Sequence, residues 1–125
     1  MPIKLYVVYG SHPCAAVARA LDMKGLPYRV VELPPPLHAA LQRVRFGTRT
    51  LPAVRLETGE KLAGSRAIMR RLEELAPEPS LFPADPEALA AVQRAEEWGD
   101  EVWQPMVRRL LWRTFTLHPQ WLSAA

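Results

Sequence analysis

The hydrophobic residues in the first part of the chain follow a strand pattern, then a helical one, then a strand pattern again. Residues 3–9 (IKLYVVY) are almost continuously apolar, which indicates a strand covered on both faces. Residues 13–24 predict a helix, with Pro13 at its first position and Gly25 at its C-terminal end. Its apolar stripe consists of Cys14, Val17 and Leu21. Residues 27–33 (PYRVVEL) predict a second strand, so the three elements form a crossover unit with parallel strands.

A second helix, a hairpin and a third helix are expected to follow. The apolar side of the short second helix comprises Leu37, Leu41 and Val44. Val54 and Leu56 alternate with charged residues, and a turn around 58–60 leads into a further strand, which predicts a hairpin. Ser65 is expected to cap the third helix, whose apolar stripe comprises Ile68, Leu72 and Leu75. The pattern therefore predicts an α/β domain over residues 1–76 with the element order βαβαββα.

The composition changes beyond the third helix. Four prolines fall in the stretch APEPSLFPADP, so we interpret residues 77–86 as a linker. Residues 87–125 are helical in pattern, and we expect Gly99 and Pro105 to bend this helix. One of its faces carries the apolar residues Ala88, Ala91, Ala95, Trp98, Val102, Met106 and Leu110. Because so short a segment cannot bury this surface by itself, we interpret it as an incomplete helical segment.

Charge and composition bear on the partners. Sixteen Lys and Arg stand against thirteen Asp and Glu, a formal net charge of +3, and the two signs are interspersed. Nucleic-acid binding needs a clustered basic face, so we expect no nucleic-acid partner. The three histidines stand far apart in the sequence, so no metal site is expected. The apolar start at 3–8 is too short for a membrane span or a signal peptide, and we expect no membrane partner. A single cysteine, Cys14, fits a reducing compartment and a cytoplasmic location.

Three stretches of the chain, taken together, resemble the N-terminal domain of glutathione S-transferases. They are YGSHPCAAVARALDMKGLPYRVVEL, RTLPAV and LAGSRAIMRRLEEL, and a proline-rich linker and a helix with tryptophans follow them. The resemblance covers roughly residues 3–104. It implies a thioredoxin-like domain with a mixed four-stranded sheet, followed by the start of a helical domain, and glutathione as co-substrate. It is less specific for function, because the family holds transferases, reductases, isomerases and binding proteins.

The resemblance also implies roles for individual residues. Ser11 matches the position of the family's active-site Ser or Cys, and Cys14 matches the second cysteine of dithiol relatives such as glutaredoxins. Leu51 and Pro52 match a turn with a cis peptide, where the backbone before the proline pairs with the cysteinyl part of glutathione. Ser65 matches the serine that receives the γ-glutamyl carboxylate. The other positions expected to bind glutathione are Thr50, Gly64 and Arg66.

One position departs from the family pattern. The residue before the serine is commonly acidic in the family, and here it is Gly64. A carboxylate that would hold the ammonium group of the ligand is therefore missing. Weak glutathione binding, compensation by Glu57, Glu60 or a partner subunit, and use of another thiol are the three consequences that the resemblance leaves open.

Three functions follow from these residues. In the first, a transferase, the Ser11 hydroxyl donates a hydrogen bond to a thiolate that attacks a small electrophile. The second is a glutaredoxin-like redox module in which Cys14 exchanges with glutathione disulfide, although the position of this residue on the apolar face favours a buried, inert thiol. The third is a non-catalytic scaffold that mediates dimerisation. The apolar helix at the end of the chain leads us to expect a homodimer.

Overall fold

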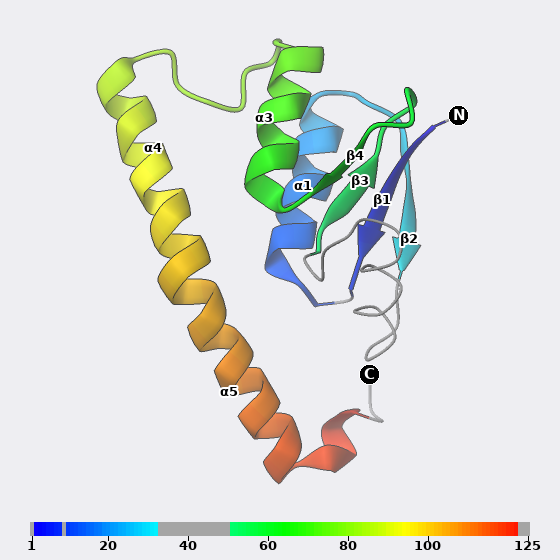
Figure 1. The fold of residues 1–125 in the computed structure, drawn as a ribbon, viewed down its shortest axis with the longest axis vertical. Coiled ribbons are helices and arrows are strands. Elements are labelled where there is room, and N and C mark those ends of the chain that lie inside the picture. The colour runs from blue at the N-terminus through cyan, green and yellow to red at the C-terminus, as the bar shows by residue number, and fades with distance from the viewer. Residues whose placement is uncertain (1, 9, 33–50, 123–125) are drawn as a thin grey trace. The chain divides into compact units, whose positions relative to one another are not determined.

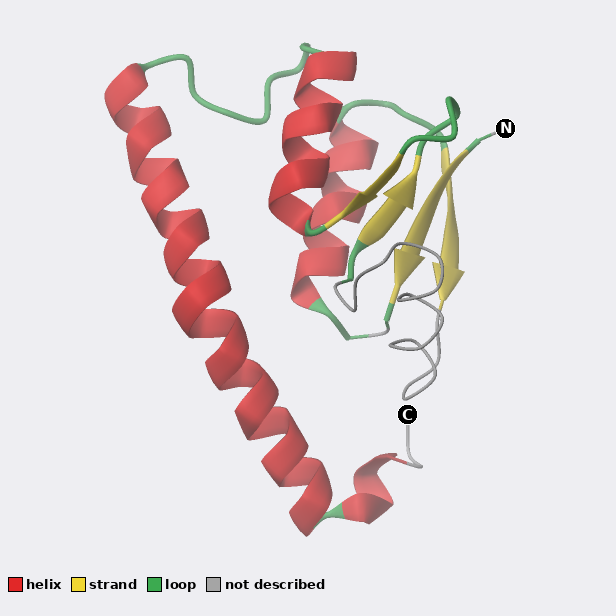
Figure 2. Ribbon diagram, viewed as in Figure 1, coloured by secondary structure: helices red, strands yellow, loops and turns green. Residues whose placement is uncertain are grey.

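Four strands form one mixed sheet in the computed structural model, which describes residues 2–8, 10–32 and 51–122 (Figures 1 and 2). The strands are β1 (Ile3–Val7), β2 (Tyr28–Glu32), β3 (Ala53–Arg55) and β4 (Lys61–Ala63), and their order in the sheet is β2-β1-β3-β4. β1 pairs with β2 in parallel and with β3 in antiparallel fashion, and β3 pairs with β4 in antiparallel fashion. The expected mixed four-stranded sheet is thus confirmed, and so is the parallel crossover.

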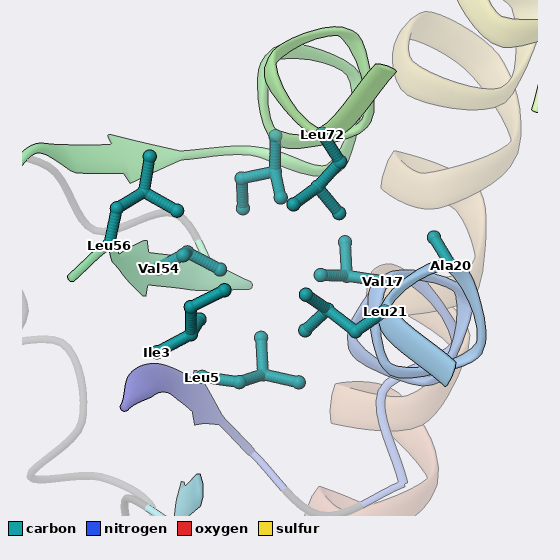
Figure 3. Close-up of a cluster of buried hydrophobic side chains, with 9 residues drawn as sticks. Ile3, Leu5, Val17, Ala20, Leu21, Val54, Leu56 and Leu72 are labelled. Carbon is teal, nitrogen blue, oxygen red and sulfur yellow. The ribbon is translucent and has the colours of Figure 1, made fainter. Parts of the chain in front are cut away.

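Two helices pack against one face of this sheet (Figure 2). They are α1 (His12–Met23) and α3 (Ser65–Leu75), and side chains from both helices meet those of β1 and β3 in one core (Figure 3). The core residues are Ile3, Leu5, Val17, Ala20, Leu21, Val54, Leu56, Ile68 and Leu72, all at most 5% exposed. The apolar stripes predicted for α1 and α3 are confirmed except at Leu75, the last residue of α3, which is 46% exposed.

Gly25 ends α1 as its sequence position suggests. Its φ of +63° is one that residues with a Cβ rarely adopt, and it turns the chain back over the last turn of the helix. The amide of Gly25 donates to the carbonyl of Asp22 (3.0 Å), and the amide of Leu26 donates to that of Leu21 (3.1 Å). These two bonds satisfy two of the carbonyls that a helix end leaves open, where the chain turns toward β2.

The start of α3 differs from our expectation by one residue. Ser65 is the first helical residue and not the cap, because the cap position is occupied by Gly64, whose carbonyl accepts the first helical hydrogen bond from the amide of Ile68 (3.1 Å). Gly64 has a φ of +89°, and it is the single residue between the end of β4 and the start of α3. The prediction failed because Ser and Gly are both favoured at this boundary, and only the backbone angle decides between them.

An ion pair between a buried lysine and a partly buried glutamate joins the ends of α1 and α3 to the segment that follows α3. The side chain of Lys24 is fully buried, and its Nζ donates to Glu73 Oε2 (2.6 Å) and to the carbonyl of Ala76. Glu73 also accepts from the hydroxyl of Ser80 (2.6 Å) and the amide of Leu81 (2.9 Å). Partial burial by itself raises the pKa of Glu73, but these three hydrogen bonds and the Lys24 charge outweigh it and lower the pKa to about 2.

The chain divides into two compact units after Leu81. The second unit, Phe82–Ala125, consists of α4 (Pro86–Trp98), a π-helical turn η1 (Gly99–Trp103), α5 (Gln104–Leu117) and a short 3-10 helix η2 (Pro119–Leu122). Asp85 caps α4 by accepting from the amide of Ala88 (2.8 Å). Gly99, where we expected a bend, is the first residue of the π-helical turn, and Pro105, the other expected position, lies in the first turn of α5. No helix among the described residues is long and apolar enough to cross a membrane.

Two of our expectations concern residues outside the described part of the chain. They are the short second helix inferred from Leu37, Leu41 and Val44, and the glutathione-binding position Thr50.

Candidate functional site

The register of the sheet brings three of the sequence-predicted segments to one end of it. Tyr6 of β1 pairs with Ala53 of β3, so the chain leaves β1 toward Ser11 at the same end where it arrives from Leu51. The amide of Gly64 donates to the carbonyl of Pro52 (2.9 Å), which attaches the start of α3 to the same place. Positions that are far apart in the sequence therefore converge at this end, which we call the candidate site, defined by Ser11, Leu51, Pro52, Gly64, Ser65 and Arg66.

Ser11 occupies the cap position of α1 with an extended backbone. Its carbonyl accepts from the amide of Ala15 (3.1 Å) and its amide donates to the carbonyl of Val8 (3.3 Å). Its hydroxyl makes no capping hydrogen bond to the first turn of the helix, although serine at this position usually does so. The side chain is half-buried. The Ser11 hydroxyl therefore does not occupy the backbone amides at the positive end of α1. Both the hydroxyl and these amides can then act on one ligand.

A glycine sets the direction of the chain just before Ser11. Gly10 has a φ of +80°, and an added Cβ would meet nothing within 4 Å, so the backbone angle is what favours glycine here. Sequence reasoning did not select Gly10 as a site residue. The signal was present in the break GSHP between the first strand and the first helix, where glycine is typical of a left-handed turn.

The peptide bond between Leu51 and Pro52 is cis, as the family resemblance implied. Pro52 is buried and Leu51 is half-buried. The described part of the ladder between β1 and β3 begins at Ala53, so Leu51 stands before the paired strand rather than within it.

The start of α3 presents a second helix N-terminus at the candidate site. No side chain caps it, and its first turn contains no acidic residue. Ser65 and Arg66 are half-buried in this first turn. Backbone amides at such a terminus, together with the helix dipole and an arginine, favour an anionic group. The arrangement suits a carboxylate.

Glu57 and Glu60 both lie away from position 64, where the acidic residue is missing. Both lie in the turn between β3 and β4, whose amide and carbonyl bonds join Leu56 to Gly59 and Glu60. This turn is at the end of the hairpin opposite to Pro52 and Gly64. Glu60 is also engaged with Arg71, whose Nε lies 3.1 Å from Glu60 Oε2. Of the consequences that the resemblance leaves open, compensation by these two residues is therefore not favoured by the structure, because a hairpin separates its turn from its open end.

Cys14 lies in the first turn of α1, on the same buried stripe as Val17 and Leu21. It is only 4% exposed, and its thiol is free of any disulfide. A thiol that attacks a disulfide must be reached by it, and this one faces the core side of the helix. The catalytic role that we predicted for Cys14 stays a prediction, while the expected burial is confirmed.

Comparison with known proteins gives the same assignment for most of the chain. A family model described as glutathione S-transferase, N-terminal domain, matches residues 5–80. A maleylacetoacetate isomerase from Pseudomonas aeruginosa is 34% identical over 106 residues, which is 78% of this chain and 46% of that protein.

Solved structures agree with this match. A glutathione S-transferase from Methylobacterium radiotolerans, in complex with glutathione sulfonate, has a TM-score of 0.76 and 29% identity over 91% of this chain and 54% of its own. A glutathione transferase homologue from Sulfitobacter, with bound glutathione, has a TM-score of 0.72 and 26% identity over 80% of this chain and 49% of its own. The chain spans about half the length of these relatives. It belongs to the glutathione S-transferase family, whose N-terminal domain it carries over residues 5–80.

Proposed function

We propose that the chain binds glutathione at the candidate site and holds its sulfur as a thiolate for attack on a small electrophile. The observation that carries this proposal is the uncommitted start of α1, where the Ser11 hydroxyl makes no capping bond and stands at the same end of the sheet as Leu51 and Ser65. Relatives of similar fold hold glutathione or its sulfonate, which supports the choice of ligand.

The energetic requirement is modest. A thiol with an ordinary pKa of about 8.5 is only a few per cent ionised at neutral pH, so each unit by which the pKa falls raises the thiolate population nearly tenfold at first. A hydrogen bond to a charged acceptor contributes about 1.5 to 3 kcal/mol, and one pKa unit corresponds to about 1.4 kcal/mol. The Ser11 hydroxyl alone would thus lower the pKa of the bound thiol by about one to two units. The positive end of α1 acts in the same direction.

The other end of glutathione would be held by the start of α3. The γ-glutamyl carboxylate accepts from the amides of the first turn and from the Ser65 hydroxyl, and Arg66 adds positive charge nearby. The backbone of Leu51 pairs with the cysteinyl part between the two helix ends. Gly64 offers no carboxylate for the ammonium group, so this site binds glutathione more weakly than a site with an acidic residue there.

In this proposal the serine is a hydrogen-bond donor and the attacking atom is the sulfur of glutathione. The thiolate forms a bond to the electrophilic carbon, the leaving group departs with its electron pair, and the thiol proton has already gone to solvent. Burial of Cys14 favours this transferase over the redox module, because exchange with glutathione disulfide requires an accessible sulfur.

The test is calorimetric titration of the full chain with glutathione, followed by measurement of the pKa of the bound thiol from the ultraviolet absorbance of its thiolate. Ser11→Ala is expected to raise that pKa by about one to two units and to lower the rate of conjugation to a chloronitrobenzene at neutral pH about tenfold or more. Thr58→Ala, which removes an exposed hydroxyl from the turn at the other end of the hairpin, is the matched control and leaves both unchanged. Absence of binding to glutathione, or an unchanged thiol pKa in Ser11→Ala, contradicts the proposal.

A further inference from the structure

The two helices of the first unit lie side by side and run in the same direction (Figure 1). Both begin at the candidate site, α1 with Ser11 as its N-terminal cap residue and α3 with Gly64. Their C-terminal cap residues, Lys24 and Ala76, lie at the far end. α1 has 12 residues and α3 has 11, so each helix is about 17 Å long. Because the two lengths are nearly equal, a bond between the far ends brings the two starts level.

A single ammonium group joins these far ends. The side chain of Lys24 is fully buried, and its Nζ donates to Glu73 Oε2 (2.6 Å) and to the carbonyl of Ala76. Helices that run in the same direction bring their negative ends together, and a cation placed there interacts favourably with both. The ammonium therefore belongs to the end of α1 and is bonded to the end of α3.

Between the two ends, apolar side chains make the contact of α1 with α3. Val17 and Leu21 of α1 lie fully buried in one core with Ile68 and Leu72 of α3. Burial of apolar surface is non-directional, whereas a hydrogen bond weakens steeply when its length or angle changes. The bonds of the lysine therefore define the position of one helix relative to the other more narrowly than the apolar contacts do.

Net stability does not explain a buried ammonium at this place. The cost of taking two charges out of water offsets much of their attraction, and well-packed apolar side chains of the same volume would stabilise the fold as well or better. An apolar pair, however, sets no fixed distance between particular atoms of two helices. The carboxylate is itself held in place, because Glu73 also accepts from the hydroxyl of Ser80 (2.6 Å) and the amide of Leu81 (2.9 Å).

We propose that Lys24 and Glu73 are a positioning pair, which sets the spacing between the helix starts that hold the sulfur and the γ-glutamyl carboxylate of glutathione. This inference rests on the proposed function, in which Ser11 donates to the sulfur and the start of α3 binds the carboxylate. One ligand must meet both helix starts at once, so a displacement of either helix lengthens or bends the bond from the Ser11 hydroxyl. The pair touches no ligand and acts through the two helices.

The first measurement is the pKa of the thiol of bound glutathione, read from the ultraviolet absorbance of its thiolate. Lys24→Met, Glu73→Gln and the double variant Lys24→Met/Glu73→Gln are each expected to raise this pKa by about half a unit and the dissociation constant of glutathione about threefold. Through space alone, the two single substitutions remove opposite charges and would shift the pKa in opposite directions. A rise in all three variants therefore indicates displaced helix starts.

Glu74→Gln is the matched control, because it removes an exposed carboxylate of α3 that pairs with Arg71. It is expected to leave both the pKa of the bound thiol and the dissociation constant unchanged. A loss of stability by itself lowers the amount of folded chain, but not the pKa of a thiol that is bound to folded chain. The double variant leaves no buried charge unpaired, so it is expected to fold even where a single variant does not.

The second measurement needs no ligand. Residual dipolar couplings of the backbone amides give the angle between α1 and α3, which is expected to change in the double variant and not in Glu74→Gln. An unchanged angle overturns the proposal, and so does a changed angle with the wild-type thiol pKa. Failure of the wild-type chain to bind glutathione contradicts the proposed function and with it the role of the pair in the site, while the angle still shows whether the pair aligns the helices.

Discussion

The two units of this chain are built in opposite ways. The first, Met1–Leu81, closes a core between one face of a sheet and two helices, in which nine apolar residues are at most 5% exposed. The second, Phe82–Ala125, contains no buried residue in α4, η1 or α5, and several of its tryptophans and leucines are about half exposed. A mixed sheet with a crossover helix can bury its apolar residues internally, whereas a single long helix cannot bury its own stripe. The first unit is therefore stabilised by a core of its own, whereas the described helices of the second unit have no such core.

Removing a core side chain from the first unit should give the largest effect. Leu72 of α3 is fully buried, and Leu72→Ala is expected to lower the free energy of unfolding by about 3 to 4 kcal/mol through lost burial and the cavity that remains. Leu110→Ala removes the same atoms from a side chain that is 66% exposed, and a loss below about 1 kcal/mol is expected. Urea denaturation of both variants makes the comparison. Equal losses would show that the second unit is buried in solution to the same degree.

Breaking the ion pair between Lys24 and Glu73 should give the second-largest loss of stability. Glu73→Gln leaves the Lys24 ammonium buried without its carboxylate, and a loss of about 2 to 3 kcal/mol is expected. Glu74→Gln, which removes an exposed carboxylate paired with Arg71, serves as the neighbouring control, with a loss below about 1 kcal/mol.

The same pair predicts the direction of the pH dependence. The pKa of Glu73 is lowered from 4.5 to about 2 in the folded chain, so its contribution is fully present above about pH 4.5 and is lost as the pH falls toward 2. Stability measured between these pH values should therefore fall more steeply in the wild type than in Glu73→Gln. Parallel pH profiles would contradict the assignment.

Substitutions at Gly64 should affect both the stability of the first unit and the binding of glutathione at the candidate site. Gly64→Ala is expected to cost about 1 to 2 kcal/mol, because its φ of +89° is unfavourable for a residue with a Cβ even though the Cβ itself meets nothing within 4 Å. Gly64→Glu should cost a similar amount while tightening glutathione binding, since it supplies the carboxylate that the ammonium group lacks. Denaturation and calorimetric titration of the two variants separate these effects. Weaker binding in Gly64→Glu than in Gly64→Ala would contradict the proposed orientation of the ligand.

The smallest loss of stability is expected from removing the N-terminal cap of α4. Asp85→Ala removes the capping bond to the amide of Ala88 and should reduce the stability of the long helix by about 0.5 to 1 kcal/mol. Asp85→Asn retains a side-chain acceptor and should recover most of the loss. Amide hydrogen exchange in the first turn of α4 is the suitable measurement. Equal exchange in Asp85→Ala and the wild type would mean that the cap contributes nothing.

Much of the first unit followed from local pattern. The stripe of α1 and its ending at Gly25 were visible in the sequence, because helical periodicity and a left-handed glycine are properties of a few neighbouring residues. The candidate site required more. Ser11, Leu51 and Ser65 were selected by family resemblance, while their convergence depends on the register between β1 and β3 and on the bond from Gly64 to Pro52.

The sequence by itself determined the strands, helices and turns whose signals are local, together with the apolar stripe of the last helix. The tertiary structure alone decided that Lys24 meets Glu73, that Glu57 and Glu60 lie at the end of the hairpin opposite to Gly64, and that Gly64 rather than Ser65 is the cap residue of α3. The reason is physical. Periodicity is encoded within a turn or a strand, but which distant groups share a buried charge or one end of a sheet depends on how the whole chain closes its core.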